Sequence, residues 1–431
     1  MHAIEGYTPA AAAPRLPVLL IGCVVMKRRV FCLVLFFLLA HPFPVLSQPS
    51  LQSLVDATSP GGTLRLSPGV HAGPVTLSRP IVLDGGGKAI IDGGGKRSVL
   101  RVNTGNAVVR GLILRNTGNS HDQMDSGIAI EGDSNRIEDN VIEDALFGIV
   151  LKQSNHNLVR RNHIRSKAAE LSMRGESVRL WNSIGNRIED NDIADTRDFT
   201  LMNSPNNHVS GNSIRGSRYG MHFIFSPNSH VEKNRLSYNA TGIVVLNSDY
   251  ITIRGNTLQH TANIGGACIA IKKSTEILAE GNQIVHCATA ILSDSPVGDM
   301  NRLVFRNNRI AHNTTGVQLY GERGGHIFEN NRFEKNLLQV VMSGSGNALA
   351  NRWHGNYWDD YEGFDLNHDG IGDTPHEIYA YADRIWIETP AASFFRNSPA
   401  LEVLDFLERL APFSVPDLIL RDPKPRFSSA R

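Results

Sequence analysis

Soft metal ligands recur in the first half of the chain. Cu(I) prefers thioether and imidazole ligands to hard oxygen ligands. If the segments that carry these side chains stack beside one another, the side chains come onto one region of the surface. The sequence therefore predicts a copper site, most suited to transient Cu(I), built from one set of residues: His121, Met124, Met173, Met202, Met221 and His222.

The surroundings of Met221 leave two interpretations open. Met221 and Phe223 are two residues apart, so they fall on one side of a strand, and that side is either the core or a ligand surface. If Met221 lies in the core, His222 points outward and is the better ligand. His121 and Met124 lie in an insertion between repeats, which favours exposure to solvent and transfer of a metal.

A loop rich in oxygen ligands is the second candidate metal site. Asp365, Asn367, Asp369 and Asp373 stand at positions 1, 3, 5 and 9, with glycine at position 6, as in the first part of a calcium-binding loop. The glutamate expected at position 12 is replaced by His376. The pattern predicts either a structural calcium ion or a compact turn held by hydrogen bonds from side chains to backbone.

Carboxylates are the candidates for enzyme chemistry. Enzymes that act on polysaccharides use Asp or Glu pairs, or a Lys or Arg base. The acidic residues here alternate with core positions or lie in turns, which favours a solvated surface. We predict no catalytic residue and no enzyme activity, with a polysaccharide lyase or epimerase as the alternative. The carboxylates considered are Asp92, Asp122, Asp125, Glu143, Asp144, Glu189, Asp190 and Asp198.

An internal repeat determines the predicted fold. Asn, one variable residue and an apolar residue recur at intervals close to 22 residues, with short alternating strings between the copies. Short strands joined by turns stack coil on coil, and parallel crossovers are right-handed. We predict an all-β, right-handed parallel β-helix of about ten to eleven coils. The copies begin at Asn116, Asn140, Asn162, Asn191, Asn212, Asn234, Asn256, Asn282, Asn308, Asn331 and Asn351.

The repeated asparagine has a structural explanation. Its side chain tolerates a left-handed turn and bonds to backbone, and stacked copies can bond to one another as a ladder. Recurrent glycines are predicted to mark another turn with positive φ. These are Gly127, Gly148, Gly220, Gly242 and Gly316.

The amino end has the order of a secretory signal. A basic segment at 26–29 precedes an apolar run at 30–40 that is too short to span a bilayer. We expect residues 1–47 to comprise a signal peptide with an over-long extension before the true start at Met26. Cys268 and Cys287 remain in the exported chain at different phases of their repeats, which favours two buried thiols over a disulfide.

The remaining segments are predicted to close the two ends of the solenoid and to form a tail. We expect a helix and a first strand at 51–68 to close the amino end, and the β-helix to span residues 48–351. An aromatic, acidic cap with the calcium-like loop follows at 352–395. A short helix and a proline-rich tail at 396–431 are predicted to dock on a neighbouring protein. Lys plus Arg is 43 and Asp plus Glu is 42, a balance that argues against nucleic acid as a partner.

The cap and the tail carry a family resemblance. The cap contains Gly-Asn-Tyr-Trp-Asp-Asp-Tyr at 355–361 and Asp-Leu-Asn-His-Asp-Gly-Ile-Gly-Asp-Thr-Pro at 365–375. The tail contains Pro-Phe-Ser-Val-Pro at 412–416 and Leu-Arg-Asp-Pro-Lys-Pro at 420–425. Together they resemble the NosD family, periplasmic accessory proteins of nitrous oxide reductase. The asparagine-phased coils are shared by many carbohydrate-active β-helices and are not specific.

The resemblance implies a role in assembly. NosD-like proteins work with the membrane subunit and ATPase of an ABC transporter and with a copper-chaperone lipoprotein. Their client is nitrous oxide reductase, whose copper–sulfide centre they help to mature. The family is described as copper-binding, and the resemblance assigns no individual ligand in this sequence.

Overall fold

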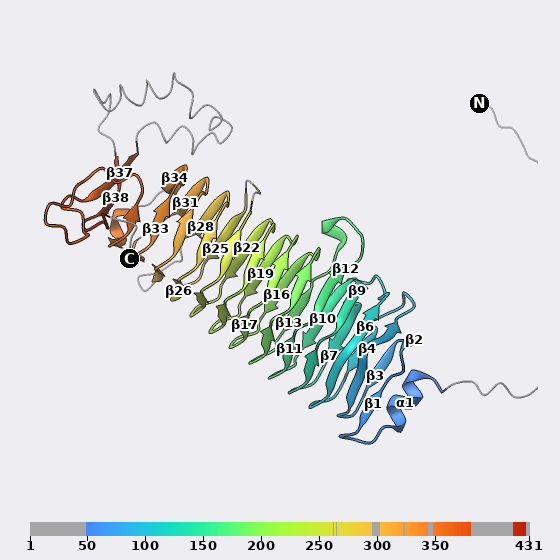
Figure 1. Cartoon of the computed structure of the whole chain (residues 1–431). Helices are drawn as coiled ribbons and strands as arrows, with labels where there is room; N and C mark the ends of the chain where they lie inside the picture. Colours follow the sequence, from blue (N-terminus) through green and yellow to red (C-terminus); the bar gives the residue numbers. More distant parts are fainter. Residues whose placement is uncertain are drawn as a thin grey trace, which may run out of the picture. The chain divides into compact units, whose positions relative to one another are not determined.

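The computed structural model describes residues 49–261, 263, 265–294, 302–321, 324–343, 348–380 and 417–427. They form a parallel β-helix whose strands are stacked turn on turn from residue 63 to residue 358, as Figure 1 shows. The predicted right-handed, all-β solenoid is confirmed. The predicted signal peptide and the predicted helix near the carboxyl end lie outside the described residues. No helix in the described part of the chain is long and apolar enough to cross a membrane.

Each turn before the last contributes one strand to each of three faces, and the last described turn contributes strands to the first two faces. The first face contains β1 (Thr63–Arg65), β8 (Arg136–Glu138), β11 (Leu158–Arg160), β14 (Arg187–Glu189), β17 (His208–Ser210), β20 (His230–Glu232), β23 (Thr252–Arg254), β26 (Ile277–Glu280), β29 (Leu303–Arg306), β32 (Ile327–Glu329) and β35 (Arg352–His354). Two long strands run through both the first and the second face, namely β4 (Val82–Asp92) and β6 (Val108–Arg115).

The second face runs beside the first along the length of the solenoid. It contains β2 (Gly69–Ala72), β9 (Val141–Ala145), β12 (His163–Ser166), β15 (Asp192–Ala194), β18 (Ser213–Arg215), β21 (Arg235–Ser237), β24 (Thr257–Gln259), β27 (Gln283–Val285), β30 (Arg309–Ala311), β33 (Arg332–Glu334) and β36 (Tyr357–Trp358).

The third face is a separate twelve-stranded sheet. It contains β3 (Val75–Leu77), β5 (Leu100–Val102), β7 (Ser126–Ile130), β10 (Phe147–Lys152), β13 (Val178–Trp181), β16 (Asp198–Met202), β19 (Tyr219–Ile224), β22 (Thr241–Leu246), β25 (Ala267–Lys272), β28 (Thr289–Asp294), β31 (Thr315–Tyr320) and β34 (Leu338–Ser343). Its twelve strands correspond to twelve turns, slightly more than predicted, because the first turns lack the asparagine that marks the repeat.

The amino end is closed as predicted by a short helix. Helix α1 (Leu51–Ala57) begins after Ser50, whose hydroxyl accepts a hydrogen bond from the backbone N–H of Ser53 at 3.2 Å. Leu51 and Val55 are buried from this helix in the same core that fills the solenoid. They cover the apolar interior that the first turn would otherwise expose to water.

Buried asparagines bond each turn to the next. The side-chain amide of each donates to the side-chain oxygen of the asparagine one turn on, at 2.9–3.0 Å. The same oxygen also accepts the backbone N–H of the preceding asparagine. This asparagine ladder comprises Asn140, Asn162, Asn191, Asn212, Asn234, Asn256, Asn282, Asn308, Asn331 and Asn356.

Two details of the predicted repeat are wrong. The left-handed conformation belongs to the residue before the asparagine, for example Asp139 with φ 57° and Lys233 with φ 55°. The left-handed residue turns the side chain of the asparagine inward. There its amide bonds to backbone groups that the turn would otherwise leave without a partner. The last ladder member is Asn356 and not Asn351, because Asn351 bonds instead to the backbone N–H of His326 at a different corner.

The recurrent glycines are also explained differently from the prediction. They do not have positive φ; they stand where the next turn passes too closely for a side chain. A Cβ on Gly148 would lie 2.2 Å from the carbonyl oxygen of Ser177, and one on Gly242 would lie 2.3 Å from that of Cys268. The space between adjacent turns, rather than backbone conformation, requires glycine here.

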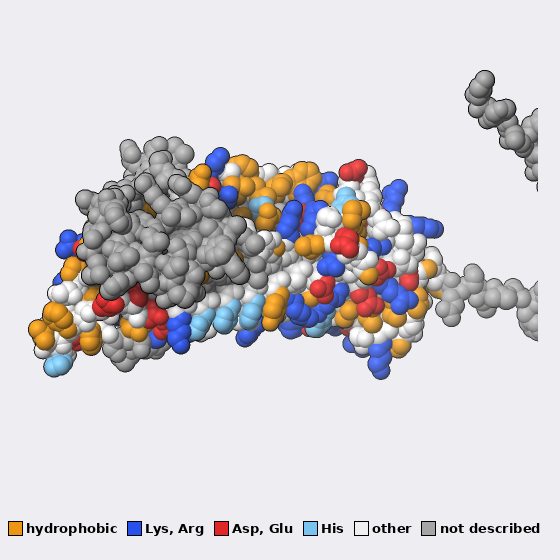
Figure 2. Space-filling model, turned by 90° about the horizontal axis from the view of Figure 1, so that it is seen from above, with side chains coloured by type: hydrophobic (Ala, Val, Ile, Leu, Met, Phe, Trp, Pro, Cys, Tyr) orange, Lys and Arg blue, Asp and Glu red, His pale blue; other side chains and the backbone are white. Residues whose placement is uncertain are grey.

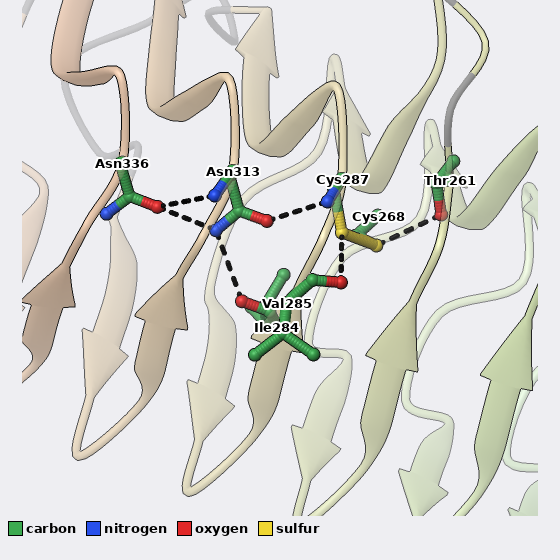
Figure 3. Close-up of a disulfide and its surroundings, with 7 residues drawn as sticks. All are labelled: Thr261, Cys268, Ile284, Val285, Cys287, Asn313 and Asn336. Carbon is green, nitrogen blue, oxygen red and sulfur yellow. Dashed lines mark hydrogen bonds between the residues drawn. A yellow bond between two sulfur atoms is a disulfide. The ribbon is translucent and has the colours of Figure 1, made fainter.

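The two cysteines form a disulfide, contrary to the prediction of free thiols. Their Cα atoms are 6.1 Å apart, and Figure 3 shows the bond at a corner of the solenoid. Cys268 lies on β25, whereas Cys287 lies at the corner before β28, in the place of Thr261 one turn earlier. The difference in phase did not exclude pairing. The corner before β28 turns the side chain of Cys287 inward, over the start of β25 on the neighbouring turn.

The carboxyl end is closed by aromatic stacking and by an aspartate. Trp358 stacks on Phe333 and His376, with ring centroids 4.2 and 4.8 Å apart. Asp422 takes the next place in the asparagine ladder, since its Oδ2 accepts the backbone N–H of Asn356 at 3.0 Å and the side-chain amide at 2.9 Å. A carboxylate only accepts, so it ends the ladder without leaving a donor unpaired.

Part of the tail therefore lies on this chain itself. Asp422 belongs to β38 (Asp417–Asp422), which pairs antiparallel with β37 (His376–Ala380), and Leu420 is fully buried. The docking of the tail on a neighbouring protein stays a prediction, since pairing within the chain does not test it. This segment was expected to be extended because of its prolines, but extended chain can also complete the chain's own cap.

The ladder leads to a prediction about stability. The side chain of Asn256 makes four buried hydrogen bonds, two accepted from Asn234 and one donated to each of Val231 and Asn282. Asn256→Ala leaves buried partners unpaired and should destabilise the fold by about 2–4 kcal/mol. Thermal unfolding would measure this, with the exposed Gln283→Ala as the control. Equal melting temperatures for the two variants would contradict a stabilising role for the ladder.

The disulfide leads to a second prediction. If residues 1–47 are removed on export, Cys268 and Cys287 are the remaining cysteines. A thiol-reactive reagent should find no free thiol in the denatured mature protein and two after reduction. Two free thiols before reduction, in protein prepared from an oxidising compartment, would show that the bond does not form.

The cap leads to a prediction about pH. Burial lowers the pKa of His376 to about 4, against about 6.5 in an unfolded chain. The native protein then binds fewer protons than the unfolded chain. The stability that depends on neutral His376 is therefore fully present above pH 6.5 and is lost as the pH falls from about 6.5 to about 4.

The measurement is the melting temperature between pH 7 and pH 4 in the native protein and in His376→Phe. We expect the variant to lose less stability on acidification. Burial raises the pKa of the neighbouring Asp360 to about 6, which acts in the opposite direction, so the difference between the two proteins is the informative quantity. Parallel pH curves would contradict the assignment to His376.

Candidate functional site

Two insertions and the third face enclose a hollow of about 650 Å³. One insertion lies between β6 and β7, and the other, between β12 and β13, contains the short 3-10 helix η1 (Leu171–Met173). The insertions touch, because His121 Nε2 lies 3.2 Å from the carbonyl oxygen of Met173. The hollow therefore depends on contacts between residues 52 positions apart.

Four of the six predicted copper ligands line this hollow: His121, Met124, Met173 and Met202. Met173 is 62% exposed, whereas Met124 is half-buried and packs against Leu146, Phe147 and Val150. Met202 lies on β16 beside Trp181 of β13 and is half-buried.

The other two predicted ligands lie elsewhere. Met221 is fully buried in the core, so it is corrected from ligand to core residue, because its position on β19 points inward like that of Phe223. His222 points outward but lies one strand beyond the hollow, level with Thr200. Its ring packs edge-on against Tyr219 at 4.9 Å, and burial lowers its pKa.

Aromatic rings form the apolar part of the hollow. Phe147 and Trp181 both line it, and the His121 ring meets Phe147 edge-on with centroids 5.7 Å apart. Lys152 lies over the Trp181 ring at 5.7 Å. The contacts with Met173 and Phe147 orient the His121 ring and engage one of its two nitrogens.

A cluster of charges lies under one side of the hollow. Arg179 and Arg197 line it, and both approach the buried Glu176, with Arg179 Nη1 donating to Glu176 Oε1 at 2.8 Å and Arg197 3.6 Å away. Asp198, which is also buried, accepts two hydrogen bonds from Arg218, at 3.0 and 2.5 Å. The carboxylates thus offset much of the arginine charge next to the hollow.

Glu176 has the most unusual environment of this cluster. Burial raises its pKa, and the nearby Asp198 carboxylate adds to the shift, while Arg179 and Arg197 oppose it. Its Oε2 is buried and has no hydrogen-bond partner among the described residues. A raised pKa moves the carboxyl towards neutral pH, which makes Glu176 the strongest candidate for acid–base chemistry here.

The predicted calcium loop is closed by its own hydrogen bonds. Asp365 accepts the backbone N–H groups of Asp369 and Gly370, and Asp373 accepts that of Leu366 at 2.7 Å. Asn367 and Asp369 add further bonds within the loop. Within the described ranges, no three His, Cys, Asp or Glu side chains converge to hold a metal ion. Calcium binding by this loop stays a prediction.

Sequence reasoning missed Arg179 and Arg197. Both line the hollow, yet the sequence shows them only as charged residues near strand ends. Alternation in Val-Arg-Leu-Trp at 178–181 indicates that Arg179 and Trp181 share the outward face, so part of the signal was present. The missing information was which insertion covers that face.

The model of a family described as "Periplasmic copper-binding protein (NosD)" matches residues 161–363. Two relatives are each called "Probable ABC transporter binding protein NosD". The one from Stutzerimonas stutzeri is 28% identical over 367 residues, which cover 81% of this chain and 83% of the relative. The one from Pseudomonas aeruginosa PAO1 is 26% identical over 370 residues, which cover 81% and 85%.

The chain is thus similar to the NosD family, through the family model and through these two relatives. The segment that matches the family model includes Met173 and Met202 but not His121 and Met124, so it covers only part of the hollow. Among solved structures, the catalytic domain of a GH87 alpha-1,3-glucanase is similar, with a TM-score of 0.50 and 14% identity over 73% of this chain and 70% of the glucanase domain. That likeness concerns the fold alone.

Proposed function

We propose that this chain is a periplasmic copper-binding accessory protein that carries Cu(I) in the hollow between the two insertions. The observation that supports the proposal is the gathering of His121, Met124, Met173 and Met202 around one hollow, from segments far apart in the sequence. The family's description as periplasmic and copper-binding supports the same ion and compartment.

The donor set fits Cu(I). Three thioethers and one imidazole are neutral, soft ligands, and this combination favours Cu(I) over Zn²⁺, Mg²⁺ or Ca²⁺. One nitrogen of His121 is engaged with the carbonyl of Met173, which leaves the other for a metal. Copper is here a cargo, and the role of these side chains is to hold it in the reduced state until it is transferred.

The position of the ligands favours transfer. Met173 is largely exposed and is carried by an insertion, and His121 is carried by the other, so the insertions can separate without disturbing the stacked strands. Met202 is fixed on β16. A site with one fixed and several movable ligands suits exchange with another copper protein.

The charges around the hollow permit a cation. Arg179 and Arg197 alone would repel Cu(I), but Glu176 and Asp198 lie against them and offset much of that field. Asp122 adds a carboxylate to the lining itself.

The names of the relatives support a transporter as partner. The relatives are named as ABC transporter binding proteins, so we infer that this chain associates with the membrane subunit of such a transporter and, through it, with the ATPase at the inner membrane. We further propose that a copper-chaperone lipoprotein supplies the ion. The client is nitrous oxide reductase, whose copper–sulfide centre the protein helps to mature.

The copper site gives a direct prediction. Titration of the mature protein with Cu(I) against a competing chelator should show one tight site. Combined Met124→Ala, Met173→Ala and Met202→Ala should weaken binding at least about tenfold, because the soft ligands are lost. Met221→Leu is the matched control, since it changes a methionine in the core and should leave the affinity unchanged. Equal affinity in the triple variant and the control would exclude the hollow.

The client role needs a cellular measurement. In a host that makes nitrous oxide reductase but lacks its own NosD, the native gene should restore copper content and activity of the reductase. The triple methionine variant should restore less of both at an equal protein level. Full restoration by the variant would separate the client role from copper carriage and would support a metal-free docking scaffold.

Glu176 supports one alternative, a carbohydrate-active enzyme. Its raised pKa, its burial and the neighbouring rings of Phe147 and Trp181 resemble the components of a sugar-cleaving site. Against this, Glu176 and Asp198 are both held by arginines. Neighbouring genes discriminate between the two hypotheses. Transporter and reductase genes would favour the copper-binding accessory protein, and polysaccharide genes would favour the carbohydrate-active enzyme.

A further inference from the structure

A column of aromatic rings runs along the outside of the solenoid on four successive turns. Tyr238 stacks on His260, His260 on His286 and His286 on His312, with ring centroids 4.8, 5.2 and 5.3 Å apart and interplanar angles of 17–25°. Figure 2 shows a row of histidine side chains along one edge of the molecule. His286 and His312 are exposed, and His260 is half-buried.

The column forms because its members occupy one corner of the repeat. Each lies between the second and the third face, and each has a left-handed backbone, with φ 56–57°. Histidine is among the residues that tolerate this conformation. The corners are bonded turn to turn, since the backbone N–H of His260 and that of His286 each donate at 3.3 Å to a carbonyl oxygen one turn on. Because these corners share one backbone conformation and lie one β-sheet spacing apart, their rings stack face to face.

The spacing suits coordination by two neighbouring rings. A transition-metal ion lies about 2.0–2.1 Å from each imidazole nitrogen, so two ligating nitrogens are at most about 4 Å apart. Stacked rings with centroids 5.2–5.3 Å apart meet this condition when their outer edges tilt towards each other. The side chains of His286 and His312 are exposed, so the tilt does not disturb the core.

We propose that His260, His286 and His312 form a surface site for a divalent transition-metal ion such as Ni²⁺ or Zn²⁺, held by two adjacent imidazoles and water. No three His, Cys, Asp or Glu side chains in the described part of the chain converge on one point, so a pair of rings with water is the arrangement the column offers. Imidazole is a preferred ligand of these ions.

This site is distinct from the proposed copper hollow. It lies at a corner on later turns, and it consists of imidazoles without thioethers. Ni²⁺ and Zn²⁺ are therefore probes that discriminate between the two, because neither favours thioether ligands. The inference does not depend on the proposed function.

The column also predicts which ring matters most. His286 belongs to both histidine pairs, whereas His260 and His312 each belong to one. Lys335 has the next left-handed corner after His312, and its positive charge disfavours an ion at that end. Binding should therefore require His286, and it should depend more on His260 than on His312.

The test is calorimetric titration of the mature protein with Ni²⁺ and the variants His260→Asn, His286→Asn and His312→Asn. Asparagine tolerates the left-handed backbone, as Asn307 and Asn330 do in this chain, so these changes should leave the melting temperature nearly unchanged. We expect His286→Asn to weaken Ni²⁺ binding at least about tenfold, His260→Asn to weaken it less and His312→Asn least.

The matched control is His368→Asn. His368 is exposed and left-handed, with φ 58°, but it stacks on no ring among the described residues. Ni²⁺ binding that is equal in His286→Asn and His368→Asn, with both variants folded, would overturn the site. If the two sites are separate, His286→Asn should leave the Cu(I) affinity unchanged. A change in Ni²⁺ binding on loss of the hollow's methionines would contradict two separate sites.

Discussion

The hydrogen bond from each buried asparagine to the next is the constraint on which the rest of this structure depends. Every turn of the solenoid has a corner at which the chain leaves the first face and enters the second, and such a corner leaves backbone groups without strand partners inside an apolar core. The asparagine side chain supplies a donor and an acceptor there, and each copy completes the bonds of the copy before it. The ladder thus fixes the register of all three faces at once.

A ladder of this kind needs an end. An eleventh asparagine at the carboxyl end would leave one amide unpaired in the core, and Asp422 avoids this because a carboxylate has no donor to satisfy. The same residue brings β38 onto the cap beside the stacked rings of Trp358 and His376. These residues of the cap therefore have a structural role that is separate from any binding function: they terminate the solenoid.

The regular stacking explains why both proposed metal sites lie outside the core. Inward positions are packed between the turns above and below, so Met221 and Phe223 fill space in the core. Outward positions repeat at the spacing of a sheet. The proposed metal ligands lie where insertions or particular side chains depart from that repeat. Two insertions cover the third face to make the copper hollow, and three histidines at one corner make the exposed column. A rigid scaffold with variable loops thus separates stability from function.

The sequence by itself determined the solenoid, its amino-terminal helix and the similarity to the NosD family, because an Asn-phased period near 22 residues and the aromatic, acidic cap are local signals. It also named four residues of the hollow from their soft side chains. Only the tertiary structure decided that Met221 is buried, that Cys268 and Cys287 pair, that Arg179 and Arg197 share the hollow, and that Asp422 ends the ladder. Each of these depends on how a corner or an insertion places one turn against another. The period of the sequence gives the direction of a side chain within a strand, but it does not give the path of the chain between strands.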